Sequence, residues 1–431
     1  MANLSATLKN TAYLQNSASL FLFFASWGIW WSFFQIWLTS DRSGLSLDGG
    51  QVGTVYSVNS LATLVLMLFY GTFQDRLGTK RHLAIFVSFL MTLIGPFVIW
   101  VYQPLLKNQF MIGVVVGAIF LSAGFMAVAG LLEAIAERFS RTHGFEYGQA
   151  RMWGSFGYAV VALIAGYLFT VDPRLNFWLG SVFGLACLLV HVFWRTPDRP
   201  KSNGQVMAEV ATPGIREMLH LLKMPSLWAV IVFVVFSWTF YNVFDQQMFP
   251  EFYTNLFETQ ERGQQVYGVL NSAQVFLEAA MLGVVPLVMR KVGVRTTLLL
   301  GVSVMFFRIL GCAVLDDPIA VSMVKMLHAV EVPLFILAIL RYFTLHFKTT
   351  LSATLYMVGF QIAAQIGSVI LSPIIGQVRD ALGFHSTFLV ISAVVLASGV
   401  YAFFVLKRDD QDILGDRFIR NNNRLAETQT A

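Results

Sequence analysis

Long apolar stretches recur along the whole chain and constrain its fold more than any other feature. About 20 consecutive apolar residues are enough for a helix to cross the hydrocarbon core of a membrane. Twelve such stretches occur, near residues 20–38, 50–72, 83–103, 110–136, 148–171, 175–194, 226–249, 265–289, 297–315, 319–340, 350–377 and 386–406. The sequence therefore predicts an all-α membrane protein with twelve transmembrane helices.

The composition agrees with a membrane protein and excludes several other classes. Hydrophobic residues make up 56% of the chain and charged residues only 12%, against about 25% charged residues in soluble domains. The net charge of +5 is spread between apolar stretches and forms no basic stripe, so no nucleic acid partner is expected. The only cysteines, Cys187 and Cys312, lie in apolar runs and indicate neither a disulfide framework nor a zinc site.

The distribution of basic residues predicts the topology. Most Lys and Arg residues fall in the segments on the same side as the N-terminus, and such segments are usually cytoplasmic. Both termini are therefore expected in the cytoplasm. The first apolar run is too long for a signal peptide and has no clear small-residue cleavage site, so we expect it to stay as the first span.

A charged turn motif occurs twice and divides the chain. Its first copy, after the second span, consists of Gly71, Asp75, Arg76, Gly78 and Lys80, and a similar pattern follows the eighth span 215 residues later. The first copy resembles the charged cytoplasmic turn of the major facilitator superfamily, which implies that it braces neighbouring helices.

The longest polar interruption lies between the sixth and seventh spans and is rich in Pro, Gly and charge. The predicted organisation is two six-helix bundles, residues 1–195 and 225–406, a cytoplasmic linker at 196–224 and a cytoplasmic tail at 407–431.

Several ionisable residues fall inside the predicted spans, where they are costly and often functional. The acids are Glu133, Asp245, Glu278 and Glu331, and the bases are Arg151, Arg308 and Lys325. If His328 is neutral, one acid is left over, and an unpaired carboxylate in apolar surroundings tends to hold a proton. We predict that this acid is Glu331, with Arg308 close enough to promote proton release. The alternative is that these charges form static ion pairs between helices.

Four stretches give the chain a specific resemblance. Residues 130–159, 240–250, 267–280 and 324–334, together with Arg308, resemble the oligosaccharide:proton symporters of the major facilitator superfamily, the family of the lactose and sucrose permeases. The similarity covers nearly the whole chain and is greatest to the sucrose permease type. It implies the major facilitator fold, with two pseudo-symmetric bundles.

The resemblance also implies residue roles. The implied sugar-binding residues are Glu133, Arg151, Tyr158, Glu278, Tyr241 and His328. The implied proton-coupling residues are Glu331, Arg308 and His328, and Asp245 and Lys325 would form a structural charge pair. No catalytic or metal-binding residue is expected.

Two departures from the lactose type bear on the substrate. A helix-eight acid is replaced by Val275, with Glu278 one turn further on, and a charged pair is replaced by Asn242 and Ala364. These changes favour a sucrose transporter. Glu133, in contrast, is the longer acid of the lactose type.

The resemblance implies uptake of a disaccharide together with a proton by alternating access, with sucrose favoured. Melibiose, raffinose and lactose are alternative substrates within the family, and an uncoupled sugar facilitator is a second alternative. An enzyme is not expected, because neither an H-E-x-x-H nor a G-x-S-x-G motif is present. We expect a functional monomer in the bacterial cytoplasmic (inner) membrane, with the proton as coupling ion and no other cofactor.

Overall fold

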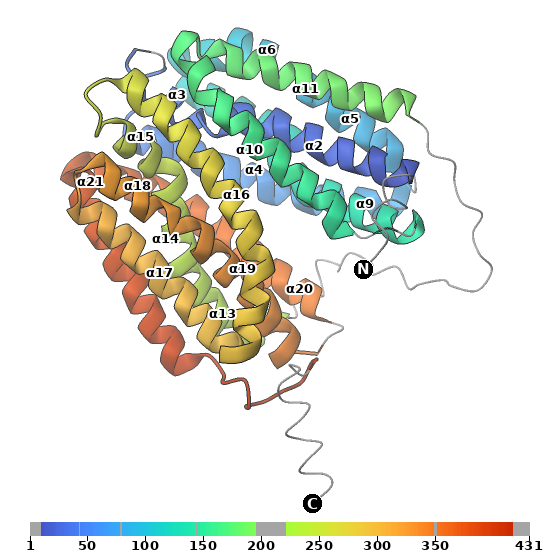
Figure 1. The fold of residues 1–431 in the computed structure, drawn as a ribbon, viewed down its shortest axis with the longest axis vertical. Coiled ribbons are helices and arrows are strands. Elements are labelled where there is room, and N and C mark those ends of the chain that lie inside the picture. Colours follow the sequence, from blue (N-terminus) through green and yellow to red (C-terminus); the bar gives the residue numbers. More distant parts are fainter. Residues whose placement is uncertain are drawn as a thin grey trace, which may run out of the picture. The chain divides into compact units, whose positions relative to one another are not determined.

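The computed structural model describes residues 10–42, 44–77, 80–143, 145, 147–194, 221–348 and 351–416 (Figure 1). Within these ranges the side chains of residues 71–77, 80–81, 131, 134–135, 137–138, 141–142 and 353 are not described. All regular secondary structure in the described ranges is helical, which confirms the predicted all-α class.

Up to residue 194 the helices are α2 (Thr11–Trp31), α3 (Phe34–Thr39), α4 (Gly49–Leu77), α5 (Lys80–Thr92), α6 (Ile94–Phe97), η1 (Val98–Tyr102), α7 (Gln103–Asn108), α8 (Phe110–Leu121), η2 (Ser122–Met126), α9 (Ala127–His143), α10 (Tyr147–Val171) and α11 (Arg174–Phe193). From residue 225 they are α13 (Pro225–Val234), η3 (Val235–Thr239), α14 (Phe240–Asn242), η4 (Val243–Met248), α15 (Phe249–Thr254), α16 (Gln260–Val292), α17 (Val294–Val314), α18 (Pro318–Met326), α19 (His328–His346), α20 (Ser352–Tyr356), η6 (Met357–Ile362) and α21 (Ala363–Val405).

The described helices include ten that are long and apolar enough to cross a membrane, or eleven if the bent pair around residue 93 forms one span. One of them, Thr354–Val405, has 52 residues and would be about 78 Å long if straight, more than twice the thickness of a hydrocarbon core. Gly383, with φ 76° and ψ 175°, interrupts it between the two last predicted spans. The stretch is therefore long enough for two crossings, and the count of twelve stays a prediction.

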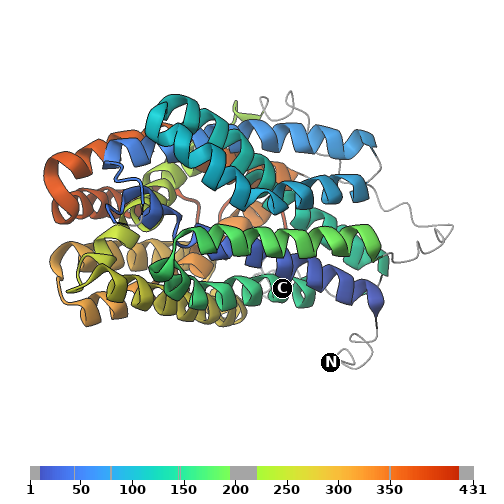
Figure 2. The same cartoon turned by 90° about the horizontal axis from the view of Figure 1, so that it is seen from above.

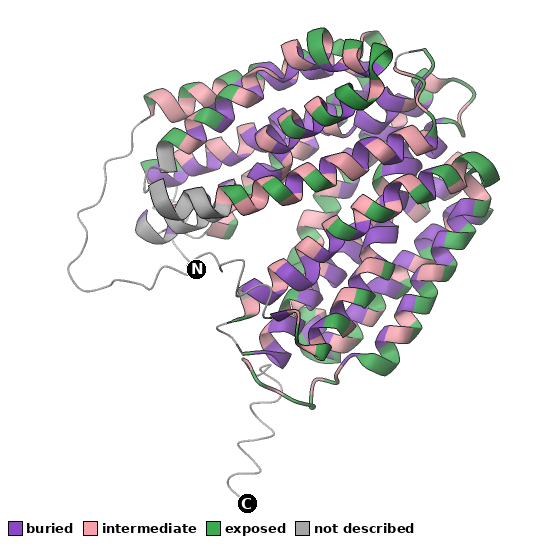
Figure 3. Ribbon diagram, turned by 180° about the vertical axis from the view of Figure 1, so that it is seen from behind, coloured by how far each residue is buried: buried purple, intermediate pink, exposed green. Residues whose placement is uncertain are grey.

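Many large apolar side chains lie on the outer faces of the helices, as expected for a membrane protein. Trp100 is 66% exposed, Phe307 62% and Phe404 77%, and exposed residues follow the outward side of the helices in Figure 3. In water such surfaces would favour association, whereas lipid chains solvate them. This surface agrees with the spans inferred from helix length.

Apart from the gaps named above, the described residues form two compact units. The first comprises residues 10–48, 54–194 and 257–276, and the second comprises 49–53, 221–256 and 277–416. In the first unit α2 packs against α10 and α11, and Figure 2 gives a second view of these helices. In the second unit α17 packs against α19 and α21. The predicted domain limits stay a prediction, since most of the linker lies outside the described residues.

Candidate functional site

A half-buried ion pair occupies the first unit. Arg151 on α10 donates from Nε to Oε1 of Glu133 on α9 over 2.6 Å, and from NH1 to the hydroxyl of Ser155 over 3.2 Å. The side chains of Arg151 and Glu133 are 31% and 36% exposed. A guanidinium presents five N–H donors in a planar fork, so this pair keeps donors and acceptors available for a polyhydroxylated ligand.

Close packing of α10 on α2 positions this pair. A Cβ atom at Gly154 would lie 2.6 Å from the Phe24 ring, and one at Gly157 would lie 2.6 Å from the carbonyl oxygen of Phe21. Glycine at these positions therefore brings the two helices together, and the Arg151 guanidinium lies 4.2 Å from the centre of the Phe24 ring. Phe24 could not be singled out from the sequence, because nothing in the linear pattern separates it from the other aromatic residues of α2.

Tyr158 lies on the same helix, two turns after Arg151. A Cβ atom at Gly28 would come within 2.7 Å of its ring, so the half-buried Tyr158 side chain contacts the α2 backbone directly. The three predicted sugar-binding residues of this half of the chain, Glu133, Arg151 and Tyr158, thus belong to the first unit.

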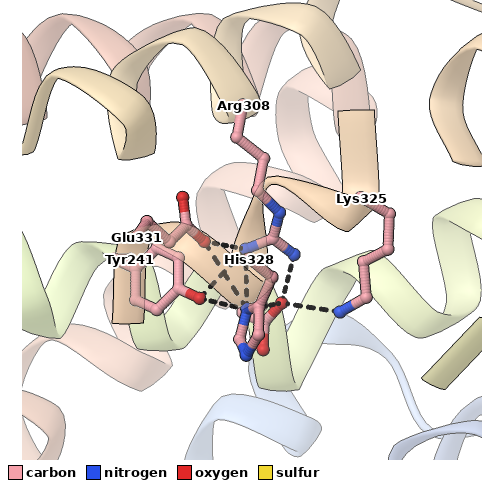
Figure 4. A network of polar contacts seen from close by, with 6 residues as sticks. Tyr241, Arg308, Lys325, His328 and Glu331 are labelled. Atoms are coloured by element: carbon pink, nitrogen blue, oxygen red, sulfur yellow. Dashed lines mark hydrogen bonds and ion pairs between the residues drawn. The ribbon is translucent and has the colours of Figure 1, made fainter. Parts of the chain in front are cut away.

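A second, deeply buried cluster of charges occupies the second unit (Figure 4). Its members come from five helical segments: Tyr241 from α14, Asp245 from η4, Arg308 from α17, Lys325 from α18, and His328 and Glu331 from α19. Asp245 lies in a π-helical segment, a feature that is frequent at functional sites.

Arg308 is the centre of this cluster. Its side chain is fully buried, and NH1 donates to Oε1 of Glu331 over 2.6 Å and to the Tyr241 hydroxyl over 3.0 Å. NH2 donates to Oδ1 of Asp245. Two carboxylates from different helices therefore share one guanidinium.

Lys325 and His328 complete the network. Lys325 Nζ donates to Oδ1 of Asp245 over 3.0 Å, so Asp245 has two cationic partners. His328 Nδ1 lies 3.5 Å from both Asp245 and Glu331 and is hydrogen-bonded to the Tyr241 hydroxyl. An imidazole in this place can receive a proton from one neighbour and pass it to another.

Glu331 differs from the prediction that it is the unpaired acid. Its carboxylate is fully buried and paired with Arg308 through Oε1, while Oε2 has no hydrogen-bond partner among the described residues. Arg308 lies close to Glu331, as expected, but counting charges along the sequence could not show a direct ion pair, because this pair depends on the rotation of α17 against α19.

The predicted helix around Lys325 is one span, Pro318–His346, with a tighter turn at Leu327. α18 ends at Met326 and α19 begins at His328, and at the junction Leu327 N bonds to the carbonyl of Val324 and Val330 N to that of Leu327. These tighter i to i+3 bonds shift the face of the helix. Lys325, before this turn, contacts Asp245, and Glu331, after it, contacts Arg308.

The structure gives less information on the remaining predicted residues. Glu278 lies on α16 and is half-buried. Of the turn motif, Gly71, Asp75 and Arg76 belong to α4 and Lys80 begins α5, but their side chains are not described. Gly78 lies outside the described residues. Within the described part of the chain, no group of three or more His, Cys, Asp or Glu residues could hold a metal ion.

Comparison with known proteins identifies the family of this chain. The family described as LacY proton/sugar symporter matches residues 5–418. The chain is 40% identical over 411 residues to the sucrose permease of Escherichia coli, covering 95% of this chain and 97% of the relative. It is 35% identical over 408 residues to the raffinose permease of Escherichia coli, covering 94% and 95%.

A solved structure supports the fold. The crystal structure of the nucleoside transporter NupG superposes with a TM-score of 0.77 over 92% of this chain and 99% of NupG, at 13% sequence identity. This likeness concerns the fold alone. The family match and the two permeases confirm the resemblance read from the sequence, and the family consists of transporters and not of enzymes. The chain is therefore a multi-pass membrane transporter that belongs to the LacY proton/sugar symporter family.

Proposed function

We propose that this protein takes up sucrose together with a proton across the bacterial cytoplasmic membrane by alternating access. The observation that carries the proposal is the fully buried Arg308 with Glu331 and Asp245 bound to it. Removing such charges from water costs several kcal/mol per ion. A protein that only let sugar diffuse through would have no need of them, whereas proton coupling requires a buried group that can gain and lose charge.

The proposed sugar contacts in the first unit are Glu133, Arg151 and Tyr158. The Arg151 fork would donate to adjacent sugar hydroxyls, and Glu133 would accept from them while the Arg151 contact holds it in place. Tyr158 would present an apolar ring face to a pyranose or furanose. In the second unit we assign sugar contacts to Tyr241, His328 and Glu278.

Glu331 is the proposed carrier of the proton. When it is protonated, its attraction to Arg308 weakens and the network around His328 can rearrange. Coupling then needs only that protonation raises the affinity for sugar, because the sugar must raise the affinity for the proton by the same factor. Asp245 and Lys325 are assigned a structural role as a charge pair.

The proposed topology has twelve helices, with residues 1–195 and 225–406 as the two bundles. Both termini, the linker at 196–224 and the tail at 407–431 would be cytoplasmic, in keeping with the excess of basic residues there. The turn motif after the second span would brace helices during the transition. We propose that the monomer is the functional form.

Sucrose is preferred over related sugars because identity is 40% to a sucrose permease and 35% to a raffinose permease. Melibiose, raffinose and lactose remain alternatives in the same family. An uncoupled facilitator is the second candidate, favoured only if the buried charges prove to be static ion pairs.

The test uses cells that express the full chain in lightly buffered medium. Adding sucrose should make the medium more alkaline and lead to accumulation against the gradient, and a protonophore should abolish both. Competition by melibiose, raffinose and lactose in right-side-out vesicles ranks the substrates. Sucrose entry without any proton uptake would refute the symport.

A further inference from the structure

One aromatic ring contacts both cations of the buried cluster. The centre of the Phe249 ring lies 4.6 Å from Lys325 Nζ and 5.5 Å from Arg308 Cζ, and Phe249 is completely buried. Cation–π attraction is strongest where the cation is desolvated. Phe244 and Tyr241 also face Arg308, at 5.1 and 5.5 Å, but among the described rings only Phe249 lies against both cations.

The neighbours of Phe249 fix its orientation. It is the first residue of α15, directly after the π-helical segment that carries Asp245. Its ring stacks on that of Tyr253 at 5.6 Å and 20°, and the Tyr253 hydroxyl lies 2.6 Å from Ser322 Oγ on α18. Since Ser322 is one turn before Lys325, the helix that presents the ammonium group also anchors the aromatic stack.

The two carboxylates of the cluster are not equivalent. Asp245 binds both Arg308 and Lys325, whereas Arg308 is the one Lys or Arg in contact with Glu331 among the described residues. His328 faces both carboxylates at 3.5 Å. The other titratable groups around Arg308 are the Tyr241 hydroxyl, bonded to it, and the Cys312 thiol one turn further along α17.

We propose that Phe249 is a positioning residue for proton coupling. By attracting Arg308 and Lys325 together, its ring keeps both cations on the Asp245 side of the cluster. Arg308 then depends less on Glu331 for its stabilisation. Glu331 can therefore gain a proton while Asp245 and the ring still stabilise the guanidinium. This inference rests on the proposed function, because it assigns a role in the proton step.

Removing the aromatic ring should have a defined effect. With an aliphatic side chain at position 249, only carboxylates and the remaining rings would hold the guanidinium. The guanidinium would then depend more on Glu331, which already lies 2.6 Å from it and is the carboxylate that it does not share with Lys325. Glu331 would then keep its charge to a lower pH, and the pH midpoint of sugar-coupled proton uptake would shift to the acid side.

The experiment compares three variants of the full chain in proteoliposomes. Phe249→Leu keeps an apolar side chain but removes the ring, and Phe249→Trp restores an aromatic face. Phe252→Leu is the matched control, since Phe252 is also buried in α15. Its ring lies 6.4 Å from that of Phe249, but it packs on Phe384 and Phe388 and not on Arg308 or Lys325. For each variant, proton-driven sucrose accumulation and sucrose exchange at equal concentrations are measured from pH 5 to 9.

We expect Phe249→Leu to move the midpoint of accumulation by about one pH unit, a tenfold change in proton concentration, while exchange persists. Phe249→Trp should move it back toward the parent value, and Phe252→Leu should leave it unchanged. An unchanged profile for Phe249→Leu, or equal shifts for the two leucine variants, would overturn the inference. If the parent chain itself shows no proton uptake with sucrose, the proposed function fails instead.

Discussion

Because two cations share Asp245, neutralising Asp245 and neutralising Lys325 should change the stability of the protein by different amounts. Asp245→Asn leaves Lys325, which is 2% exposed, without the carboxylate to which it donates. Lys325→Met leaves Asp245 still bound to Arg308. We therefore expect Asp245→Asn to destabilise the protein more than Lys325→Met, and the double variant to recover part of the loss.

The magnitudes follow from burial. Removing one partner of a buried ion pair costs about 3–5 kcal/mol, because a charge stays buried without compensation. This is the expected loss for Asp245→Asn. Lys325→Met removes one charge-assisted hydrogen bond from an acid that keeps another, which costs about 1.5–3 kcal/mol. The double variant removes both charges, so its stability should lie closer to that of Lys325→Met.

Both cysteines serve as natural reporters for this measurement. Cys187 and Cys312 are free and buried, so a thiol-reactive dye labels them as the protein opens. Where opening and closing are fast relative to labelling, a difference of about 1.4 kcal/mol in the free energy of opening changes the labelling rate about tenfold. If Lys325→Met labels as fast as Asp245→Asn, or the double variant is no slower than Asp245→Asn, the shared-carboxylate geometry is wrong.

Three further predictions concern transport. Glu331→Gln should retain sucrose exchange and lose accumulation driven by a proton gradient, since an amide cannot take up and release a proton as a carboxylate does. Normal accumulation would place the coupling proton on another residue. Arg151→Ala and Arg151→Lys should both lose sucrose binding, measured by substrate protection. Both should lose little stability, because the ion pair of Arg151 with Glu133 is one-third exposed. Sucrose binding by the lysine variant would contradict a role for the guanidinium fork. Gly28→Ala should weaken sucrose affinity and lower the stability by about 1–3 kcal/mol, because the added methyl group overpacks against Tyr158. An unchanged KM for sucrose would exclude the proposed contact between Tyr158 and the sugar.

Much of the site could be anticipated because charge within a span is visible in the sequence. Glu133 and Arg151 stand out in apolar surroundings, and the pattern around them carries the family resemblance. The sequence could not reveal Phe24 or Phe249. Aromatic residues are abundant in this chain, and which of them contacts a cation depends on helix packing.

The sequence by itself determined the class of protein, its family and the set of buried charges, because runs of apolar residues and the cost of ionisable groups in lipid are local properties. The resemblance also anticipated the contact between Asp245 and Lys325. Only the tertiary structure decided that Arg308 binds both Glu331 and Asp245. Arg308 joins Glu331 and Asp245 because separate helices bring them within hydrogen-bond distance, and Lys325 reaches the same Asp245 oxygen, which the π-helical segment η4 presents. These contacts depend on helix rotation and on a local change of hydrogen bonding, which a periodic apolar pattern does not specify.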